Sequence, residues 1–285
     1  MKLFVDNLTN VDVSYLDAQR GLVGESWLTG IMLDGSLDKQ SMICDFGVVK
    51  RNAKKWLDDY IDHRLVVPTK MPGLSIDKHD KLTTVKCPHP TGGEFICSAP
   101  HEAFCFIECA TIDNQSVAQW LSQQLTSIIP GEIAELKISL HNELIGGAFY
   151  HYSHGLKKHD GNCQRIAHGH RSKIEIFIDG ARQPELEKDW AKKWHDIYVG
   201  TLEDLHNTTT LHSIEHNHYR YQAPQGDFSL TLPASACYNM DSDTTVEQIA
   251  KHIAKTLLES GHSVTVKAFE GVGKGAIAEY EQKTD

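Results

Sequence analysis

The chain has 285 residues, a net charge of −10 and 40% hydrophobic residues, which together indicate a folded protein with one large domain or two ordinary ones. The acidic balance argues against a nucleic-acid-binding protein, and the lack of a long apolar run argues against a membrane-spanning one. The start MKLFVDNLTN is not typical of a secretory signal peptide, so we expect a cytoplasmic protein.

The predicted elements of the amino-terminal half begin with two strands and a helix. Residues 11–16 and 27–33 alternate as strands do, and an apolar stripe follows over 49–61. The tract 71–94 is rich in Pro and Gly and predicts a long loop or hairpin. A second amphipathic helix is expected over 115–128, followed by a strand over 136–140.

The carboxyl-terminal half repeats this order. Strands are predicted at 149–154 and 173–179, a less clearly patterned helical region at 185–204, a helix at 246–258 and a last strand at 264–268. The second helix has the pattern Thr244-x-x-Glu247, which predicts a capping box.

Three segments match between the halves in the same order, which favours an ancient duplication. GESWLTGIMLDG (24–35) aligns with GHRSKIEIFIDG (169–180). Residues 95–125 and 228–257 both run from an apolar stretch through a proline, a cysteine-containing stretch and a polar cap into an amphipathic helix. Ile61-Asp62-His63 before a proline also has a counterpart in Ile214-Glu215-His216. We therefore expect an α+β protein of two domains, 1–146 and 147–285, each with an antiparallel four-stranded sheet and two helices on one face.

Histidines supply the clearest sign of chemistry. The chain has seventeen, none before His63, and His154, His168 and His170 fall on two strands predicted to pair. Residues two apart in a strand share a face, so these imidazoles can converge and leave one tetrahedral position open on zinc, as in catalytic sites. Cys163 could instead close a structural site, and a set of surface histidines is the plain alternative.

The motifs together resemble the 6-pyruvoyltetrahydropterin synthase and 6-carboxytetrahydropterin synthase family. They are Tyr150 with His154, a cysteine before His-Gly-His, Asp45-Phe46 with Lys50, Asp62-His63-Arg64-Leu65, Thr245-x-Glu247-x-x-Ala250 and Val266-x-Ala268-x-Glu270. The resemblance covers nearly the whole chain as two tandem copies. It implies the tunnelling fold and a zinc-dependent lyase acting on 7,8-dihydroneopterin triphosphate, of either the 6-carboxy or the 6-pyruvoyl type.

The same resemblance implies roles for individual residues. His154, His168 and His170 bind zinc, Cys163 is a general base, Asp62 and His63 form the acid pair, and Glu270 grips the pterin ring. In the family the Asp-His pair comes from a neighbouring subunit, so we expect the first copy to supply it to the second copy's zinc site. Glu215 and His216 remain the alternative pair for that site.

The first copy lacks the metal ligands, because the gapless alignment places Val23 and Glu25 opposite His168 and His170. Four residues separate Cys163 from His168, where the family usually has three, and Arg171 departs from its pattern. These departures sustain a second hypothesis, a non-catalytic tunnelling-fold protein that binds a pterin or purine or serves as an assembly partner. Because the fold usually closes its sheets with further copies, we expect a homo-oligomer.

Overall fold

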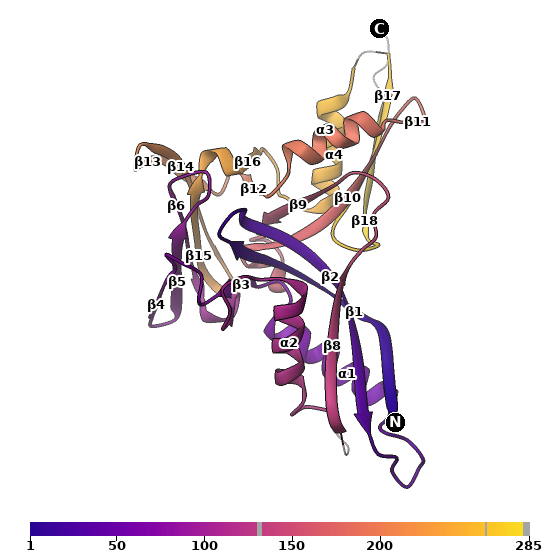
Figure 1. The fold of residues 1–285 in the computed structure, drawn as a ribbon. Helices are drawn as coiled ribbons and strands as arrows, with labels where there is room; N and C mark the ends of the chain where they lie inside the picture. Colours follow the sequence, from indigo (N-terminus) through magenta and orange to yellow (C-terminus); the bar gives the residue numbers. More distant parts are fainter. Residues whose placement is uncertain (130–132, 260, 282–285) are drawn as a thin grey trace.

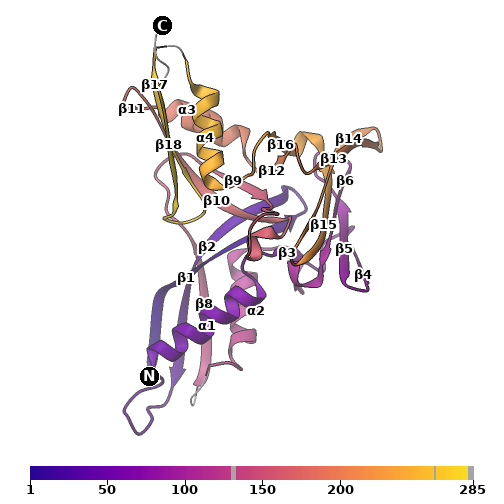
Figure 2. The same ribbon diagram turned by 180° about the vertical axis from the view of Figure 1, so that it is seen from behind.

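The chain folds twice through one series of elements, which the computed structural model describes over residues 1–129, 133–259 and 261–281 (Figures 1 and 2). The amino-terminal half contains β1 (Lys2–Asp17), β2 (Gly21–Gly35), α1 (Phe46–Tyr60), β3 (Leu65–Pro68), β4 (Ser75–His79), β5 (Leu82–Pro88), β6 (Glu94–Pro100), a 3₁₀ turn (His101–Ala103), β7 (Phe104–Ile107), α2 (Asn114–Leu125) and β8 (Ile133–Asn142).

The carboxyl-terminal half repeats these elements and adds a 3₁₀ turn before β10 and two strands, β11 and β18. It contains β9 (Phe149–His154), a 3₁₀ turn (Asn162–Gln164), β10 (His168–Ile178), β11 (Ala181–Arg182), α3 (Pro184–Lys193), β12 (Ile197–Thr201), β13 (Leu205–Leu211), β14 (Ile214–Ala223), β15 (Gly226–Pro233), a 3₁₀ turn (Ala234–Ala236), β16 (Cys237–Met240), α4 (Val246–Leu257), β17 (Ser263–Phe269) and β18 (Gly275–Glu281).

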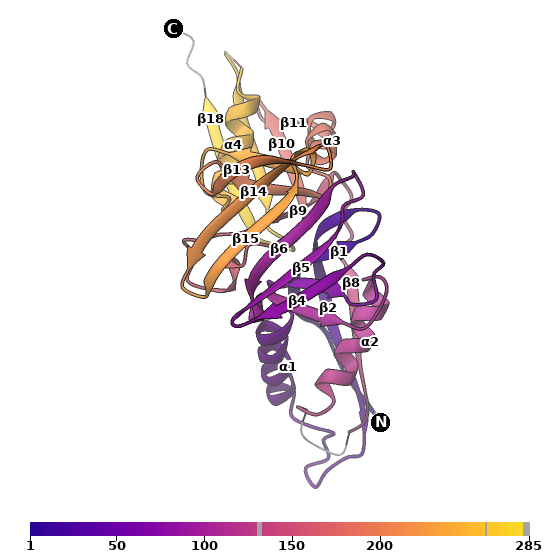
Figure 3. The ribbon, with the colours of Figure 1, turned by 90° about the vertical axis from the view of Figure 1, so that its left-hand side faces the viewer.

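The strands form three sheets. The first has the order β7-β3-β1-β2-β8, and the second has the matching order β16-β12-β9-β10-β17-β18. The third has the order β13-β14-β15-β6-β5-β4, so hairpins from both halves join through the β15–β6 pair. Figure 3 shows this shared sheet facing the viewer.

Each of the first two sheets is covered by its own pair of helices. Buried side chains of α1 and α2 pack with those of β1, β2 and β8 in one apolar cluster. Side chains of α3 and α4 pack in a separate cluster with those of β9, β10 and β17. The α+β class agrees with the sequence prediction, and each helix pair shares one core.

The predicted four-stranded antiparallel sheet is wrong in detail. β3 and β7 pair in parallel in the first half, and β12 pairs in parallel with β9 and β16 in the second. All four residues of β3 are buried, so they show no alternation that could have marked them as a strand. The tract 71–94 contains β4 and β5, which form the hairpin that was one of the two structures expected there.

The strand registers identify equivalent residues in the two halves. Gly24 pairs with Ser14 across β1 and β2, as Gly169 pairs with Ser153 across β9 and β10. These equivalent residues also touch each other, because the Ser14 and Ser153 hydroxyl oxygens lie 2.6 Å apart. A Cβ atom added to Gly169 would lie 2.7 Å from the Gly24 Cα. The two halves are therefore related by a pseudo-two-fold axis that passes between the Ser14–Gly24 pair and the Ser153–Gly169 pair. We call the contact between these two pairs the seam.

The register also corrects one predicted correspondence. Leu65 pairs with Ser14 as Tyr198 pairs with Ser153, so Asp62-His63 corresponds to His195-Asp196 and not to Glu215-His216. His63 and Asp196 share a left-handed backbone, with φ of 54° and 55°. Glu215 and His216 lie on β14, where the His216 Nε2 accepts a hydrogen bond from the Glu94 backbone.

Candidate metal and thiol site

Three buried histidines meet at the end of the β9–β10 pair. His154 and His168 face each other across the two strands, and His170 follows on the same side of β10. Each is at most 1% exposed, and one ring nitrogen from each lies within 4.8 Å of the others. The alternative of scattered surface histidines is therefore wrong.

Backbone carbonyls orient two of these rings. The His154 Nδ1 lies 2.9 Å from the Thr244 carbonyl oxygen, and the His168 Nδ1 lies 2.9 Å from the Arg165 carbonyl oxygen. Because a carbonyl only accepts, each Nδ1 carries the proton and each Nε2 keeps its lone pair. Both Nε2 atoms are buried and have no hydrogen-bond partner within the described part of the chain. Burial and the neighbouring imidazoles hold the pKa of both rings well below the usual 6.5, so neutral ligands are ready for a metal ion.

Thr244 has a different role from the one its motif predicts. The residue that caps α4 is Thr245, whose side chain accepts from the Gln248 backbone. The Thr244 hydroxyl is free to contact the His154 ring at 3.1 Å. The helix is therefore capped by Thr245, one residue later than predicted, and the contact is a single N-cap hydrogen bond where a reciprocal capping box was expected. Thr244 belongs to the histidine site instead.

Asp62 and His63 lie at the end of α1, on the opposite side of the seam. The His63 Nδ1 is 2.5 Å from the Asp62 Oδ2. The backbone of Asp12 on β1 fixes this pair, because its N–H donates to the Asp62 carboxylate at 2.8 Å and its carbonyl accepts from the His63 N–H at 2.7 Å. The left-handed backbone of His63 costs free energy that these contacts offset.

Cys163 lies in the 3₁₀ turn before β10, between the two groups. Its sulfur and ring nitrogens of His63 and His168 lie within 4.8 Å of one another. Burial lowers the pKa of His63, but the hydrogen bond with Asp62 and the adjacent Cys163 outweigh this and raise it to about 10. The structure thus brings together an acid–imidazole pair from one half and a thiol with three histidines from the other.

Glu270 lies just beyond β17 and is linked to the histidine site through Lys274 and Asp12. Its carboxylate is 3.7 Å from the Lys274 ammonium, which is also 3.4 Å from the Asp12 carboxylate. Asp12 in turn lies 3.4 Å from the His170 Nδ1. Sequence reasoning missed Asp12, because one acid in an alternating strand looks like a solvated residue.

The basic residues of the loop before β10 have partners within the chain. Lys157 and Lys158 form ion pairs with Glu203, Asp204 and Asp243. Arg165 is 4% exposed, and its guanidinium donates to the Asp62 carbonyl at 3.3 Å. This arginine therefore braces the segment that carries the Asp62–His63 pair.

The amino-terminal half contains the equivalent position without its ligands, which we call the twin pocket. Tyr15, Val23 and Glu25 stand there in place of His154, His168 and His170, as the strand registers show. Arg20 enters this pocket, where it forms two hydrogen bonds with the Asp196 carboxylate, at 2.6 and 2.9 Å, and one with the Tyr15 hydroxyl. The guanidinium of Arg20 therefore lies in the twin pocket of the half that lacks the three histidines.

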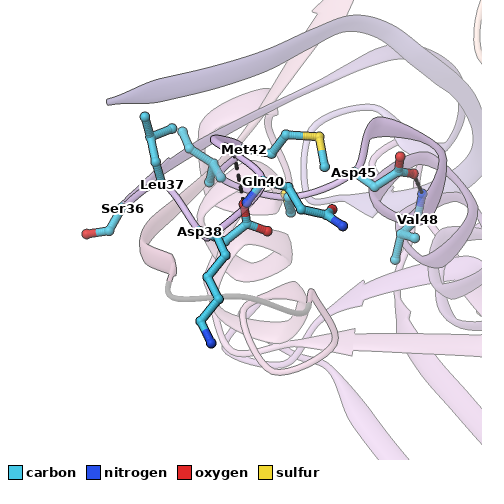
Figure 4. A pocket seen from close by; sticks show the side chains of 10 residues that line it. Ser36, Leu37, Asp38, Gln40, Met42, Asp45 and Val48 are labelled. Atoms are coloured by element: carbon cyan, nitrogen blue, oxygen red, sulfur yellow. Dashed lines mark hydrogen bonds between the residues drawn. The ribbon is translucent and has the colours of Figure 1, made fainter.

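Two cavities open to solvent lie away from the three histidines. One of about 760 Å³ is formed by the loop between β2 and α1, around Asp38, Met42 and Asp45, and contains no residue of the histidine site (Figure 4). Another of about 390 Å³ lies beside the twin pocket and is lined in part by Arg20, His195 and Asp196. Neither cavity carries the chemistry of the histidine cluster.

The fold and this cluster define an α+β protein with a buried three-histidine site that could hold a metal ion. The family model described as 6-pyruvoyl tetrahydropterin synthase matches residues 143–282. This match confirms the resemblance to that family for the half of the chain that carries the histidines.

Solved structures of the same family are similar to this chain. A catalytic-residue mutant of the Plasmodium vivax enzyme is 16% identical over 50% of this chain and 90% of its own, with a TM-score of 0.41. The Plasmodium falciparum enzyme is 16% identical over 49% and 90%, with a TM-score of 0.38. No curated protein matches the chain. Among the described residues, no helix is long and apolar enough to cross a membrane.

Proposed function

We propose that this protein is a zinc-dependent lyase of pterin metabolism that acts on 7,8-dihydroneopterin triphosphate. The product is either 6-carboxytetrahydropterin or 6-pyruvoyltetrahydropterin. The observation that carries the proposal is the meeting of three buried imidazoles, whose Nε2 atoms have no hydrogen-bond partner among the described residues, with a thiol and an acid–imidazole pair. The family match of residues 143–282 supports the same chemistry.

His154, His168 and His170 would hold the zinc ion. Zinc bound by three imidazoles acts as a Lewis acid toward hydroxyl oxygens and increases the acidity of neighbouring protons. The chain prepares for this ion by burying all three rings and by bonding the Nδ1 atoms of His154 and His168 to backbone carbonyls.

Cys163 and His63 would move the protons. As a thiolate, Cys163 accepts a proton from the substrate side chain, since the thiolate is the basic form of cysteine. Asp62 fixes the ring of His63 through Nδ1, which leaves Nε2 directed away from Asp62 to return a proton as a general acid. Proton transfer by a positioned group contributes typically 10²–10⁴-fold to the rate, so ring binding and the metal must contribute the rest.

Glu270 would recognise the pterin ring. A carboxylate accepts two hydrogen bonds from the aminopyrimidine edge, and its charge makes each bond stronger than a neutral one. Lys274 holds this carboxylate from the other side at 3.7 Å. The side chain is 23% exposed, so a ligand can reach it.

Release of inorganic triphosphate, with the zinc-loaded protein and dihydroneopterin triphosphate, tests this proposal. Cys163→Ala should lower turnover by at least 10²-fold while pterin binding remains, because only the proton acceptor is removed. Cys237→Ala is the matched control, since Cys237 is also half-buried but belongs to neither group of possible metal ligands among the described residues. Equal turnover in wild type and Cys163→Ala would refute the role of the thiol.

The second candidate is a non-catalytic protein that binds a pterin or purine or serves as an assembly partner. The observation that favours it is the longer spacing between Cys163 and His168, together with Arg171. In the structure, Arg171 lies over the Phe149 ring at 4.0 Å and donates to the Glu143 carbonyl. Wild type that binds a pterin and zinc but releases no triphosphate would establish this candidate instead.

We also propose that the protein is a homo-oligomer of the cytoplasm. The shared six-stranded sheet ends in β4, whose five residues are all exposed, and in β13, whose central residues are exposed. Free strand edges favour pairing with another chain. Sedimentation of the purified protein would test this, and a monomer at all concentrations would contradict it.

A further inference from the structure

We infer that Asp12, a residue of the amino-terminal half, is the positioning residue that holds His170 for the metal ion and links it to the Asp62–His63 pair. This inference rests on the proposed function, because it concerns the same histidine site. It means that a residue of the half without the three histidines helps to form the metal site of the other half.

The first step is the environment of His170. His154 and His168 each place Nδ1 on a backbone carbonyl, but the Nδ1 of His170 has no hydrogen-bond partner among the described residues. The Asp12 Oδ1 lies 3.4 Å from this nitrogen. A carboxylate placed behind a metal-binding imidazole fixes the ring and makes its other nitrogen a stronger ligand. Asp12 can therefore serve His170 as the carbonyls serve the other two rings.

The second step is the way in which Asp12 is held. The side chain is 3% exposed, the Ser26 hydroxyl donates to Oδ1, and the Lys274 ammonium lies 3.4 Å from Oδ2. A buried carboxylate with these neighbours remains ionised and has a fixed direction. The position beside His170 is therefore part of a built network.

The third step is the backbone of Asp12. Its N–H and its carbonyl bind the Asp62 carboxylate and the His63 N–H. One residue of β1 therefore contacts the acid pair through its main chain and a metal-binding ring through its side chain. Any movement of β1 at the seam would shift both groups together.

The twin pocket gives an internal comparison. By strand register, His151 corresponds to Asp12 and Glu25 corresponds to His170. The His151 Nδ1 lies 4.0 Å from the Glu25 carboxylate and bonds instead to the Gly24 carbonyl at 2.7 Å. Both positions keep one acid and one imidazole, but only the Asp12 side leaves the imidazole without another partner.

The test measures zinc affinity, by competition with a chromophoric chelator, for the full chain and its variants. Asp12→Asn keeps the shape of the side chain and removes its charge, so we expect the zinc dissociation constant to rise about 10- to 100-fold. Glu25→Gln is the matched control, since it removes a buried acid on the other side of the seam, and its zinc affinity should equal that of wild type.

Two further measurements separate positioning from a structural role. The visible spectrum of the cobalt-loaded protein should change in Asp12→Asn, because the field around His170 changes, while a purely structural role would leave the spectrum of the folded protein unaltered. Ser26→Ala, which removes the hydroxyl that holds Asp12, should weaken zinc binding in the same direction by less. This variant carries the test if Asp12→Asn does not fold.

The outcomes are distinct. Wild-type affinity and spectrum in folded Asp12→Asn would overturn the inference and leave the proposed function intact. Wild type that binds no zinc would overturn both. Weaker zinc binding in Asp12→Asn and unchanged binding in Glu25→Gln would support the inference.

Discussion

Glu25 makes the twin pocket sensitive to pH, and Glu25→Gln tests how. Glu25 is 6% exposed, and burial raises its pKa from 4.5 to about 7, although the Ser26 N–H and Arg171 oppose this. The folded chain therefore holds a proton on Glu25 between pH 4.5 and about 7, where the unfolded chain has lost it. Stability is complete below pH 4.5 and falls as the pH rises toward 7.

The size of the effect follows from that interval. At about 1.4 kcal/mol for each pH unit, the interval from 4.5 to about 7 corresponds to roughly 3 kcal/mol of unfolding free energy. Gln carries no charge at any pH, and its oxygen can still accept from the Ser26 N–H. Glu25→Gln should therefore resemble wild type at pH 4.5 and exceed its stability by up to about 3 kcal/mol at pH 8.

Urea unfolding of the zinc-free protein, at several values between pH 4.5 and pH 8, measures this difference. His151 lies near Glu25, and burial lowers its pKa to about 4. His151 therefore lowers the stability of the folded chain as the pH falls below 6.5. This effect is the same in wild type and in Glu25→Gln, so it cancels in the difference between them. A stability difference that is constant with pH would refute the assignment of the penalty to Glu25.

The other predictions concern the seam and the ring-binding carboxylate. Gly24→Ala should lower the unfolding free energy by about 1–3 kcal/mol, because its Cβ would collide with the Tyr152 carbonyl oxygen. The control is Gly146→Ala, whose Cβ would meet nothing within 4 Å. Equal unfolding curves for the two variants would contradict the close contact at the seam. Glu270→Gln should weaken pterin binding about 10- to 100-fold in calorimetry, through loss of a charge-assisted contact, with one zinc ion per chain retained; unchanged affinity would remove Glu270 from the ring site.

The sequence predicted the residues that carry the chemistry of the site better than it predicted the residues that hold them in place. The alternation of His168 and His170, with His154 on a paired strand, was enough to predict that three imidazoles converge, because a strand has only two faces. The predicted approach of Asp62 and His63 to Cys163 also agrees with the geometry. Their catalytic roles stay predictions, as does the domain boundary at 146.

The wrong and missed assignments share a physical cause. Local periodicity does not determine the register between strands that are distant in the sequence. Asp12 and Thr244 act through contacts 158 and 90 positions away in the chain. The pairing of Asp62-His63 with Glu215-His216 rested on similar residues before a proline. The actual counterpart, His195-Asp196, has the reverse order and can be recognised only through the pairing of β3 and β12 with their neighbours.

Covalent linkage of the two halves permits chemistry at the seam that a pair of identical chains could not have. In a symmetric homodimer, every position beside the axis carries the same residue twice, so an acid on one side demands an acid on the other. Here the two equivalent positions beside the axis carry different residues, Asp12 in one half and His151 in the other. Each copy in a single chain can change independently, so one half can contribute Asp12 and the Asp62–His63 pair while the other keeps the three histidines.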